Sequence, residues 1–207
     1  MLDTEQVAYW YFRLNGCLAL PNVLIHDRRG HEGTEVDLLA VRFPHRKELW
    51  LSGRPMADDP KLFAPESGRI EIFIVEAKQG RCALNESWLD PNRLNLQRIL
   101  FFLGPFAPLD ATEIAVGLRR TGMYKDHLYR LRLTAIGATK SDDLPPEVAQ
   151  LEWKELLRFI YDRLRPYRDV KTQHRQWDEA GQTLYSEMIV SHSSQEFTDR
   201  IIALTLA

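Results

Sequence analysis

The most constraining feature of the sequence is an apolar run, RIEIFIVEAK, at residues 69–78. Its β-branched and aromatic residues, with isoleucines at alternate positions, are typical of a β-strand. The run ends in Glu76 and Lys78, whose side chains share one face because strand side chains alternate. An ionised pair at the end of a buried strand is costly to desolvate unless a metal ion or an anionic substrate offsets the cost. The sequence therefore predicts a buried strand that carries a polar site at its end.

One helix and two strands are predicted ahead of this strand. Residues 3–14 carry apolar residues at helical spacing after a capping residue, and Asn15–Gly16 provides a stop signal. Residues 17–26 predict a strand that Pro21 either bends or confines to a sheet edge. Residues 34–43, rich in valine and leucine, predict a second strand.

An excursion that contains proline and aspartate, residues 45–67, joins the second strand to the apolar run, and its ELWL stretch is expected as a short strand. Beyond the run, Asp90–Pro91 places a capping acid before a proline, which predicts the start of a helix that ends at Gly104. A further helix is expected at residues 111–120 and a strand at residues 127–137. This order of elements predicts a mixed α/β domain around a central sheet.

The C-terminal third is predicted to be helical. Residues 144–150 contain two consecutive prolines and are expected to form a linker. Residues 151–164 carry the i, i+3, i+4, i+7 apolar stripe of a helix packed on one face. A capping box at residues 193–196 predicts a later helix. We therefore expect an α/β core at residues 1–143 and a helical C-terminal extension, residues 144–207, packed on that core.

The composition is that of a globular protein, and the cytoplasm is the expected location. The 207 residues are 44% hydrophobic and 27% charged, and no stretch approaches the roughly 18 apolar residues of a membrane span. The N-terminus lacks the pattern of a secretory signal. Cys17 and Cys82 have no C-x-x-C spacing and are expected as reduced, partly buried thiols. The net charge of −2 argues against a strong non-specific hold on nucleic acid.

A second acid is expected beside the end of the apolar run. Asp37 lies within the strand predicted at residues 34–43 and shares a face with Glu35. If the two strands are neighbours, Asp37 approaches Glu76 and Lys78. Two carboxylates supply the hard oxygen ligands that suit Mg²⁺, which is often held by only one or two of them. The sequence thus predicts a Mg²⁺ site with a lysine at its edge, where Mn²⁺ could substitute.

The spacing EVDLLAV…IFIVEAK, between an N-terminal helix and a later helix, resembles the PD-(D/E)XK nuclease superfamily, which includes restriction endonucleases. The resemblance covers about residues 3–137. It implies a restriction endonuclease-like α-β-β-β-α-β core, with a central mixed sheet flanked by helices. Two departures are visible: Val36 stands where the nominal motif has proline, and the two acids are 39 positions apart, which requires the long excursion.

The resemblance also implies roles for individual residues. Asp37 and Glu76 stand for the metal-binding acids and Lys78 for the catalytic lysine. Ala77 is the intervening residue, whose backbone carbonyl often helps to hold the metal. Many members place a glutamate near the metal on the first helix, and Glu5 is the residue that matches, although a solvated helix face explains Glu5 as well.

Further predictions concern the surroundings of this site. Gln97 matches a glutamine that some members of the superfamily place on the helix after the third strand. Glu35 is expected to pair with a basic residue rather than to bind metal. Residues 165–177 alternate basic with aromatic residues, a pattern that suits either a nucleic-acid groove or a solvated loop. The candidate nucleic-acid-binding residues among them are Arg165, Arg168, Lys171 and Arg175.

These features lead to one functional hypothesis and two alternatives. The hypothesis is a Mg²⁺-dependent endonuclease that hydrolyses phosphodiester bonds of DNA. The first alternative is a catalytically inactive binding or regulatory module in a DNA repair or defence assembly, and the second is an interaction protein without a nucleic-acid role. Without a function, Glu76 and Lys78 would be a solvent-exposed ion pair that contributes at most about 1 kcal/mol to stability. A homodimer would suit the cutting of both strands, although no residue requires one, and no membrane association is expected.

Overall fold

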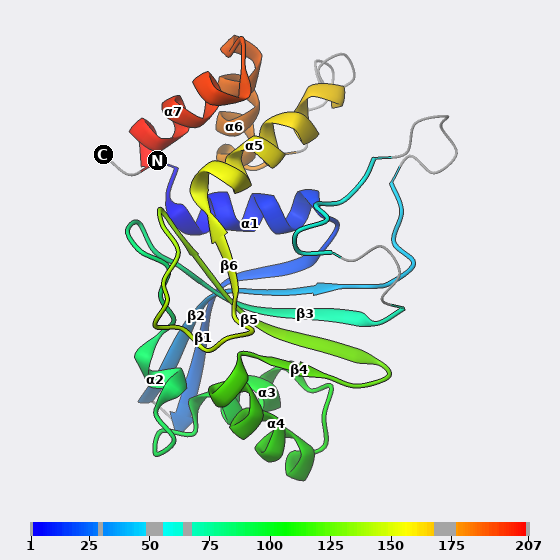
Figure 1. The fold of residues 1–207 in the computed structure, drawn as a ribbon, viewed down its shortest axis with the longest axis vertical. Helices are drawn as coiled ribbons and strands as arrows, with labels where there is room; N and C mark the ends of the chain where they lie inside the picture. Colours follow the sequence, from blue (N-terminus) through cyan, green and yellow to red (C-terminus); the bar gives the residue numbers. More distant parts are fainter. Residues whose placement is uncertain (1, 29–30, 49–55, 64–67, 168–176, 206–207) are drawn as a thin grey trace.

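The chain folds around a mixed six-stranded sheet with helices on both faces (Figure 1). The computed structural model describes residues 2–28, 31–48, 56–63, 68–167 and 177–205. In chain order its elements are α1 (Thr4–Leu14), β1 (Leu18–Arg28), β2 (His31–Arg42), β3 (Ile70–Ala77), α2 (Glu86–Leu89), α3 (Asn95–Leu103), α4 (Pro108–Thr121), β4 (Met123–Lys125), β5 (Tyr129–Gly137), β6 (Ala149–Glu152), α5 (Trp153–Leu164), the 3₁₀ helix η1 (Arg165–Tyr167), α6 (Glu179–Val190) and α7 (Ser194–Thr205).

β3 lies in the middle of the sheet, as the apolar run predicts. The strand order is β1-β2-β3-β5-β4, and β6 also pairs with β5. β3 runs antiparallel to β2 and parallel to β5, so it has a neighbour on each side. Residues 71–77 are all buried. A central strand covered by helices on both faces buries nearly every side chain, which explains the almost uninterrupted apolar run.

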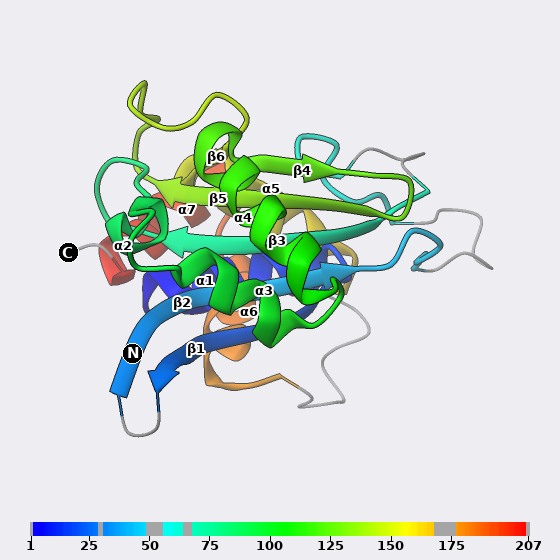
Figure 2. The same ribbon diagram turned by 90° about the horizontal axis from the view of Figure 1, so that it is seen from below.

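Each face of the sheet has its own hydrophobic cluster. α1, α5, α6 and α7 cover one face, where Trp10, Phe73 and Leu157 are buried. α2, α3 and α4 cover the other face, where Ile74 and Leu96 are buried. Figure 2 shows α3 and α4 lying across this second face. The sheet with its two helical layers is an α/β architecture.

α1 forms where the sequence predicts it. Asp3 accepts a hydrogen bond from the backbone of Gln6, and the Gln6 side chain accepts one from the Asp3 backbone, which makes a reciprocal capping box. The helix ends at Leu14, and Gly16 follows in the left-handed region with φ of +76°. Its stripe of buried residues packs against the sheet.

β1 is an edge strand of the sheet and is irregular along its length. Pro21 lies within it, Asn22 has a φ of +53°, and the register with β2 shifts twice between residues 25 and 28. Leu18, Leu20 and Leu24 are exposed. Pro21 therefore lies in a bent edge strand, as the sequence predicts.

The predicted helix start at Asp90–Pro91 is wrong. Asn85 caps a short helix, α2, and Asp90 follows its end. The Asp90 carboxylate accepts a hydrogen bond from the Asn92 backbone, which makes a turn, and α3 starts only at Asn95. The same side chain that favours a helix start also favours a turn, and here the turn prevails. The predicted end of α3 at Gly104 is confirmed.

The segment after residue 143 supplies a strand as well as helices. β6 begins inside the predicted linker, at Ala149, and pairs in parallel with β5, and neither β6 nor the short strand β4 is predicted by the sequence. The apolar stripe of α5 is buried against α1, as predicted. Ser193 accepts a hydrogen bond from the backbone of Glu196 at the start of α7, which fits the predicted cap.

Three remaining predictions concern local features. Cys17 and Cys82 are free, and both are buried more deeply than the partial burial that the sequence predicts. Most of the predicted ELWL strand lies outside the described residues, and Glu48 forms an isolated bridge with Met56. Among the described residues, no helix has both the length and the apolar character that crossing a bilayer requires.

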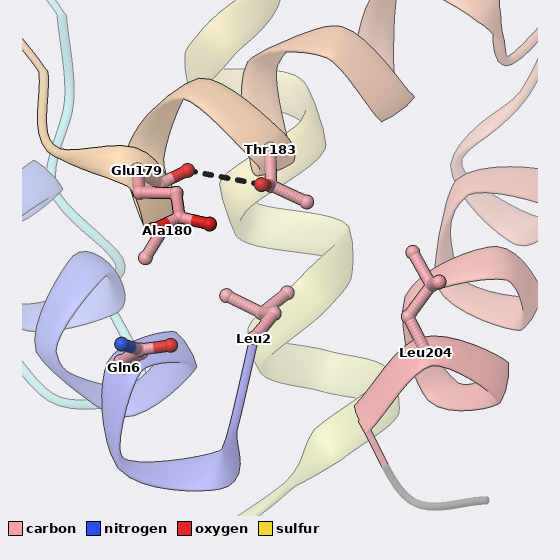
Figure 3. Close-up of a pocket in the computed structure, with 6 residues that line it drawn as sticks. All are labelled: Leu2, Gln6, Glu179, Ala180, Thr183 and Leu204. Carbon is pink, nitrogen blue, oxygen red and sulfur yellow. Dashed lines mark hydrogen bonds between the residues drawn. The ribbon is translucent and has the colours of Figure 1, made fainter.

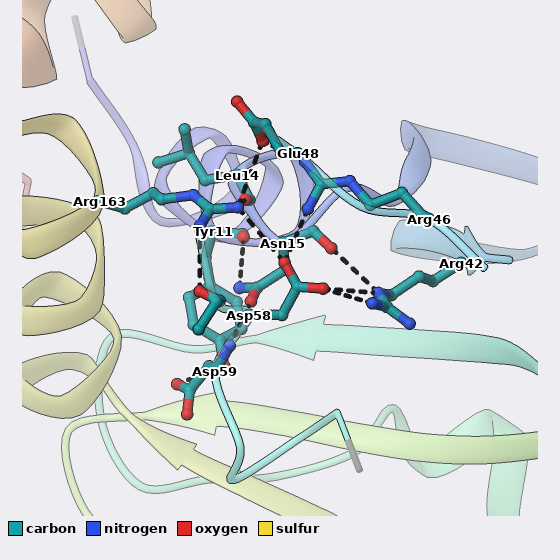
Figure 4. A network of polar contacts seen from close by, with 10 residues as sticks. Tyr11, Leu14, Asn15, Arg42, Arg46, Glu48, Asp58, Asp59 and Arg163 are labelled. Carbon is teal, nitrogen blue, oxygen red and sulfur yellow. Dashed lines mark hydrogen bonds and ion pairs between the residues drawn. The ribbon is translucent and has the colours of Figure 1, made fainter. Parts of the chain in front are cut away.

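A network of buried charges ties the excursion between β2 and β3 to α1 and α5 (Figure 4). Arg163 on α5 is 5% exposed and donates to the carbonyls of Leu14, at 2.9 Å, and Ala57, at 3.0 Å. It also pairs with Asp58, which accepts from Arg42 as well. A buried charge requires such pairing, and the network fixes the excursion beside α1.

Candidate functional site

Asp37 lies where β2 separates from β3. Leu38 and Val75 form the last regular pair, and a continuing antiparallel ladder would join Ala77 to Val36. Instead, the backbone N–H of Ala77 donates to Asp37 Oδ2 at 2.7 Å. The Asp37 carboxylate thus replaces a backbone carbonyl at the end of the ladder, which fixes it beside the end of β3.

Glu76 and Lys78 form an ion pair at the same end of β3. Lys78 Nζ lies 2.5 Å from Glu76 Oε1. The Glu76 side chain is 3% exposed and the Lys78 side chain is 45% exposed, so the carboxylate is buried while the lysine reaches the surface. Glu76 Oε2 is buried and has no hydrogen-bond partner among the described residues. We call Asp37, Glu76 and Lys78 the β3-end cluster.

The cluster has perturbed ionisation. Burial raises the pKa of Glu76 to about 7, and the charge of Asp37 adds to this effect while the Lys78 ammonium opposes it. Burial also raises the pKa of Asp37, although the N–H of Ala77 and the charge of Lys78 oppose the shift. Burial disfavours the charged form of Lys78, but Glu76, Asp37 and Glu5 outweigh it and raise the pKa of the lysine. Shifts of this kind accompany functional sites and buried ion pairs alike.

Two more acids lie within electrostatic range of the cluster. Glu5 is half-buried in the first turn of α1, and burial raises its pKa, with the charges of Asp37, Asp3 and Glu35 adding to the shift. The charge of Glu35 also raises the pKa of Glu76. The Glu35 side chain is exposed and forms no ion pair with any described residue, so the expected basic partner is absent from that part of the chain.

The other predicted site residues lie elsewhere. Gln97 is on α3, but its amide nitrogen donates to Thr112 on α4 at 2.7 Å, and it hydrogen bonds to no member of the β3-end cluster. Arg165 is exposed in η1, with its guanidinium 5.9 Å from the ring centre of Tyr161. The remaining predicted nucleic-acid contacts lie outside the described residues; they are Arg168, Lys171 and Arg175.

One residue that contacts the cluster is not predicted by the sequence. Trp153, the first residue of α5, donates its indole N–H to the backbone carbonyl of Lys78 at 2.9 Å. The apolar stripe of α5 predicts the burial of Trp153 but not this bond. An indole that is buried usually finds a hydrogen-bond acceptor, which is the one signal that the sequence offers.

One pocket near the N-terminus differs from the β3-end cluster because its lining is mostly uncharged (Figure 3). It has a volume of about 190 Å³ and lies between α1, α6 and α7. Glu179 is the one ionisable side chain among the six residues drawn, so this pocket offers less to a cation or a phosphate than the β3-end cluster does. The lining residues are Leu2, Gln6, Glu179, Ala180, Thr183 and Leu204.

The β3-end cluster offers a divalent cation two carboxylates and the backbone of Ala77. In the part of the chain that the structure describes, no group of three or more histidine, cysteine, aspartate or glutamate residues is close enough to hold a metal ion by itself. Mg²⁺ is compatible with two carboxylates because it retains several waters. The chain has no match among protein-family models, curated proteins or solved structures.

Proposed function

We propose that the chain is a metal-dependent nuclease that hydrolyses phosphodiester bonds of DNA at the end of β3. The observation that carries the proposal is the buried Glu76 Oε2, which has no hydrogen-bond partner among the described residues and lies in a cluster with Asp37 and Lys78. A buried acceptor without a donor is costly. A hard cation would satisfy that oxygen, so the residues present fit Mg²⁺ or Mn²⁺.

The order of elements supports the proposal. α1, the strands β1 to β3, the helices α2 to α4, and β5 are compatible with the α-β-β-β-α-β order that the resemblance to the PD-(D/E)XK superfamily implies, and the short strand β4 lies outside that order. β5 lies parallel to β3, so both strands end at the edge of the sheet that carries the β3-end cluster. In this assignment Asp37, Glu76 and the backbone carbonyl of Ala77 hold the metal, and Glu5 on α1 is the further acid.

Each residue of the cluster has a distinct role in the proposed reaction. Mg²⁺, when bound, supplies positive charge for the phosphate and lowers the pKa of a nearby water. Lys78, whose ammonium is near the surface, orients the attacking water and stabilises charge on the phosphate. Glu76 binds a cation only when ionised, so its pKa of about 7 makes metal binding favourable from neutral pH upwards.

The charge around the cluster explains why a metal would be needed. Glu5, Glu35, Asp37 and Glu76 outnumber Lys78, and the whole chain carries a net charge of −2. DNA phosphates would be repelled from such a site until a divalent cation neutralises it. DNA as substrate, a homodimer and a cytoplasmic location are proposals that follow from the resemblance and the composition.

The test is cleavage of supercoiled DNA, linear DNA and RNA by the pure protein with Mg²⁺ or Mn²⁺. Cleavage is expected to stop with chelator and in the variants Asp37→Asn, Glu76→Gln and Lys78→Ala. Glu113→Gln, an exposed acid on α4, is the matched control and should remain active. Cleavage that survives chelation, or equal activity in Glu76→Gln and wild type, would refute the proposal.

The second candidate is a binding or regulatory module that retains the fold without turnover. It is favoured by the absence of a three-residue metal-ligand group from the described part of the chain. Titration with Mn²⁺, followed by a DNA-binding assay, separates the two functions. A module would bind DNA with a salt-dependent affinity and leave every nucleic-acid substrate uncut while Asp37 and Glu76 are intact.

A further inference from the structure

The backbone ladder between β3 and β5 changes register at Lys78. The Lys78 N–H donates to the carbonyl of Ile136 at 2.9 Å. In a regular parallel ladder the Lys78 carbonyl would accept from Ala138. The Ala138 N–H instead donates to the carbonyl of Gly80, so the ladder leaves the Lys78 carbonyl without its usual partner.

Trp153 provides the missing hydrogen bond. Its indole N–H lies 2.9 Å from the Lys78 carbonyl, and the residue is only 3% exposed. The preceding residue, Glu152, pairs with Gly137 at the end of β6, so the sheet holds the backbone next to Trp153. The indole is thus a fixed donor rather than a mobile one.

We propose that Trp153 is a positioning residue for Lys78 in the reaction proposed above, on which this inference rests. The hydrogen bond from the indole fixes the peptide group that follows Lys78. It thereby fixes the direction in which the Lys78 side chain leaves the end of β3. Trp153 touches neither substrate nor metal in this role. Its position on α5 makes the segment after residue 143 a working part of the site rather than an independent extension.

The same tryptophan also packs in the core, and the two roles can be separated. Trp153 lies with Val7 of α1 and Ile201 of α7 around a small crevice. Trp153→Phe retains an aromatic ring for this packing but removes the N–H donor. Trp10→Phe is the matched control, because Trp10 is 1% exposed and its indole donates to Asp178 at 2.9 Å, away from β3.

The experiment combines steady-state cleavage kinetics with amide hydrogen exchange. In Trp153→Phe, kcat is expected to fall about tenfold with KM unchanged, because misplacing Lys78 affects the reacting state rather than DNA binding. Exchange of the Lys78 amide is expected to become faster, while that of Ile74 in the middle of β3 stays as in wild type. Trp10→Phe should change neither kcat nor the Lys78 amide.

Two results would overturn the inference. The first is unchanged Lys78 exchange in a folded Trp153→Phe variant, and the second is a loss of kcat in Trp10→Phe equal to that in Trp153→Phe. If the wild type cleaves no nucleic acid, the proposed function fails, whereas the exchange data still decide whether Trp153 fixes Lys78. If Trp153→Phe does not fold, exchange of the Trp153 indole hydrogen in the unaltered protein decides: slow exchange supports the bond, and exchange at the rate of a free indole refutes it.

Discussion

Replacing Glu76 by glutamine should stabilise the protein above pH 7, and it should also abolish the metal-dependent cleavage that we propose. Burial raises the pKa of Glu76 in the folded protein to about 7, against 4.5 for an unperturbed glutamate. The folded state therefore binds the proton more tightly than the unfolded state does. The associated stability is fully present below pH 4.5 and is lost as the pH rises to about 7. Glutamine is neutral and similar in shape, so it retains this stability at all pH values.

The magnitude follows from the difference between the two pKa values. It corresponds to about 3 kcal/mol of unfolding free energy at pH 8, and the 3% exposure of Glu76 means that solvent screening reduces it little. For a chain of 207 residues this is a rise in Tm of about 6–12 °C. At pH 4.5 or below, the two proteins should have nearly equal stability.

The assay is urea and thermal denaturation, followed by circular dichroism, at pH 4.5 and pH 8 with a chelator present. Glu113→Gln removes an exposed carboxylate and should show no such dependence on pH. If Glu76→Gln is no more stable than wild type at pH 8, then Glu76 is not a destabilised carboxylate in the folded protein. The stability argument for a cation at its buried oxygen would then be refuted.

Three further predictions concern the metal, one glycine and the buried network. Mg²⁺ at a hundredfold excess over its Kd should stabilise wild type by about 2.7 kcal/mol in a thermal-shift assay but leave Asp37→Asn unchanged; an equal shift in both would place the cation elsewhere. Gly137→Ala should lower the unfolding free energy by about 2 kcal/mol in urea, because its Cβ would lie 2.6 Å from backbone atoms of Cys82 and Gly80; unchanged stability would contradict this close approach. Arg163→Met should cost about 3 kcal/mol in the same assay, because it removes the donor of the Leu14 and Ala57 carbonyls and one of the three arginines that pair with Asp58; a neutral result would show that the network adds no stability.

Local signals predicted those elements whose local preference agrees with their tertiary surroundings. In α1 the capping acid, the apolar stripe and the stop at Asn15–Gly16 all indicate one helix, and the helix buries that stripe. In β3 the apolar run reflects burial on both faces. Asp90–Pro91 is a case where one local signal fits two structures, and the choice of a turn depended on α2 and on the packing of α3.

Short strands could not be predicted because their residues carry little pattern of their own. β4 has three residues and β6 has four, and each is a strand only because β5 offers it a partner. Pairing of this kind depends on residues that are distant in sequence. The proline-rich stretch before β6 predicts a linker, which describes the chain up to residue 148 but not the strand after it.

The β3-end cluster could be predicted only in part, because some of its contacts follow from local strand geometry and others join residues that are distant in sequence. Side-chain alternation joins Glu76 to Lys78, and neighbouring strands bring Asp37 close, as the structure shows. The indole bond of Trp153 joins residues that are 75 positions apart. The burial of Arg163 depends on acceptors from α1 and from the excursion, and no periodicity within α5 encodes those partners.

The irregularity of β1 has a consequence for the behaviour of the protein in solution. An edge strand with exposed leucines is a template on which a second chain could add a strand and begin a fibril. Pro21 presents no N–H there, Asn22 turns the backbone into the left-handed region, and the register shifts near Ile25 interrupt the remainder. An incoming strand would find no long uninterrupted row of donors and acceptors, so these defects protect the molecule against ordered aggregation at high concentration.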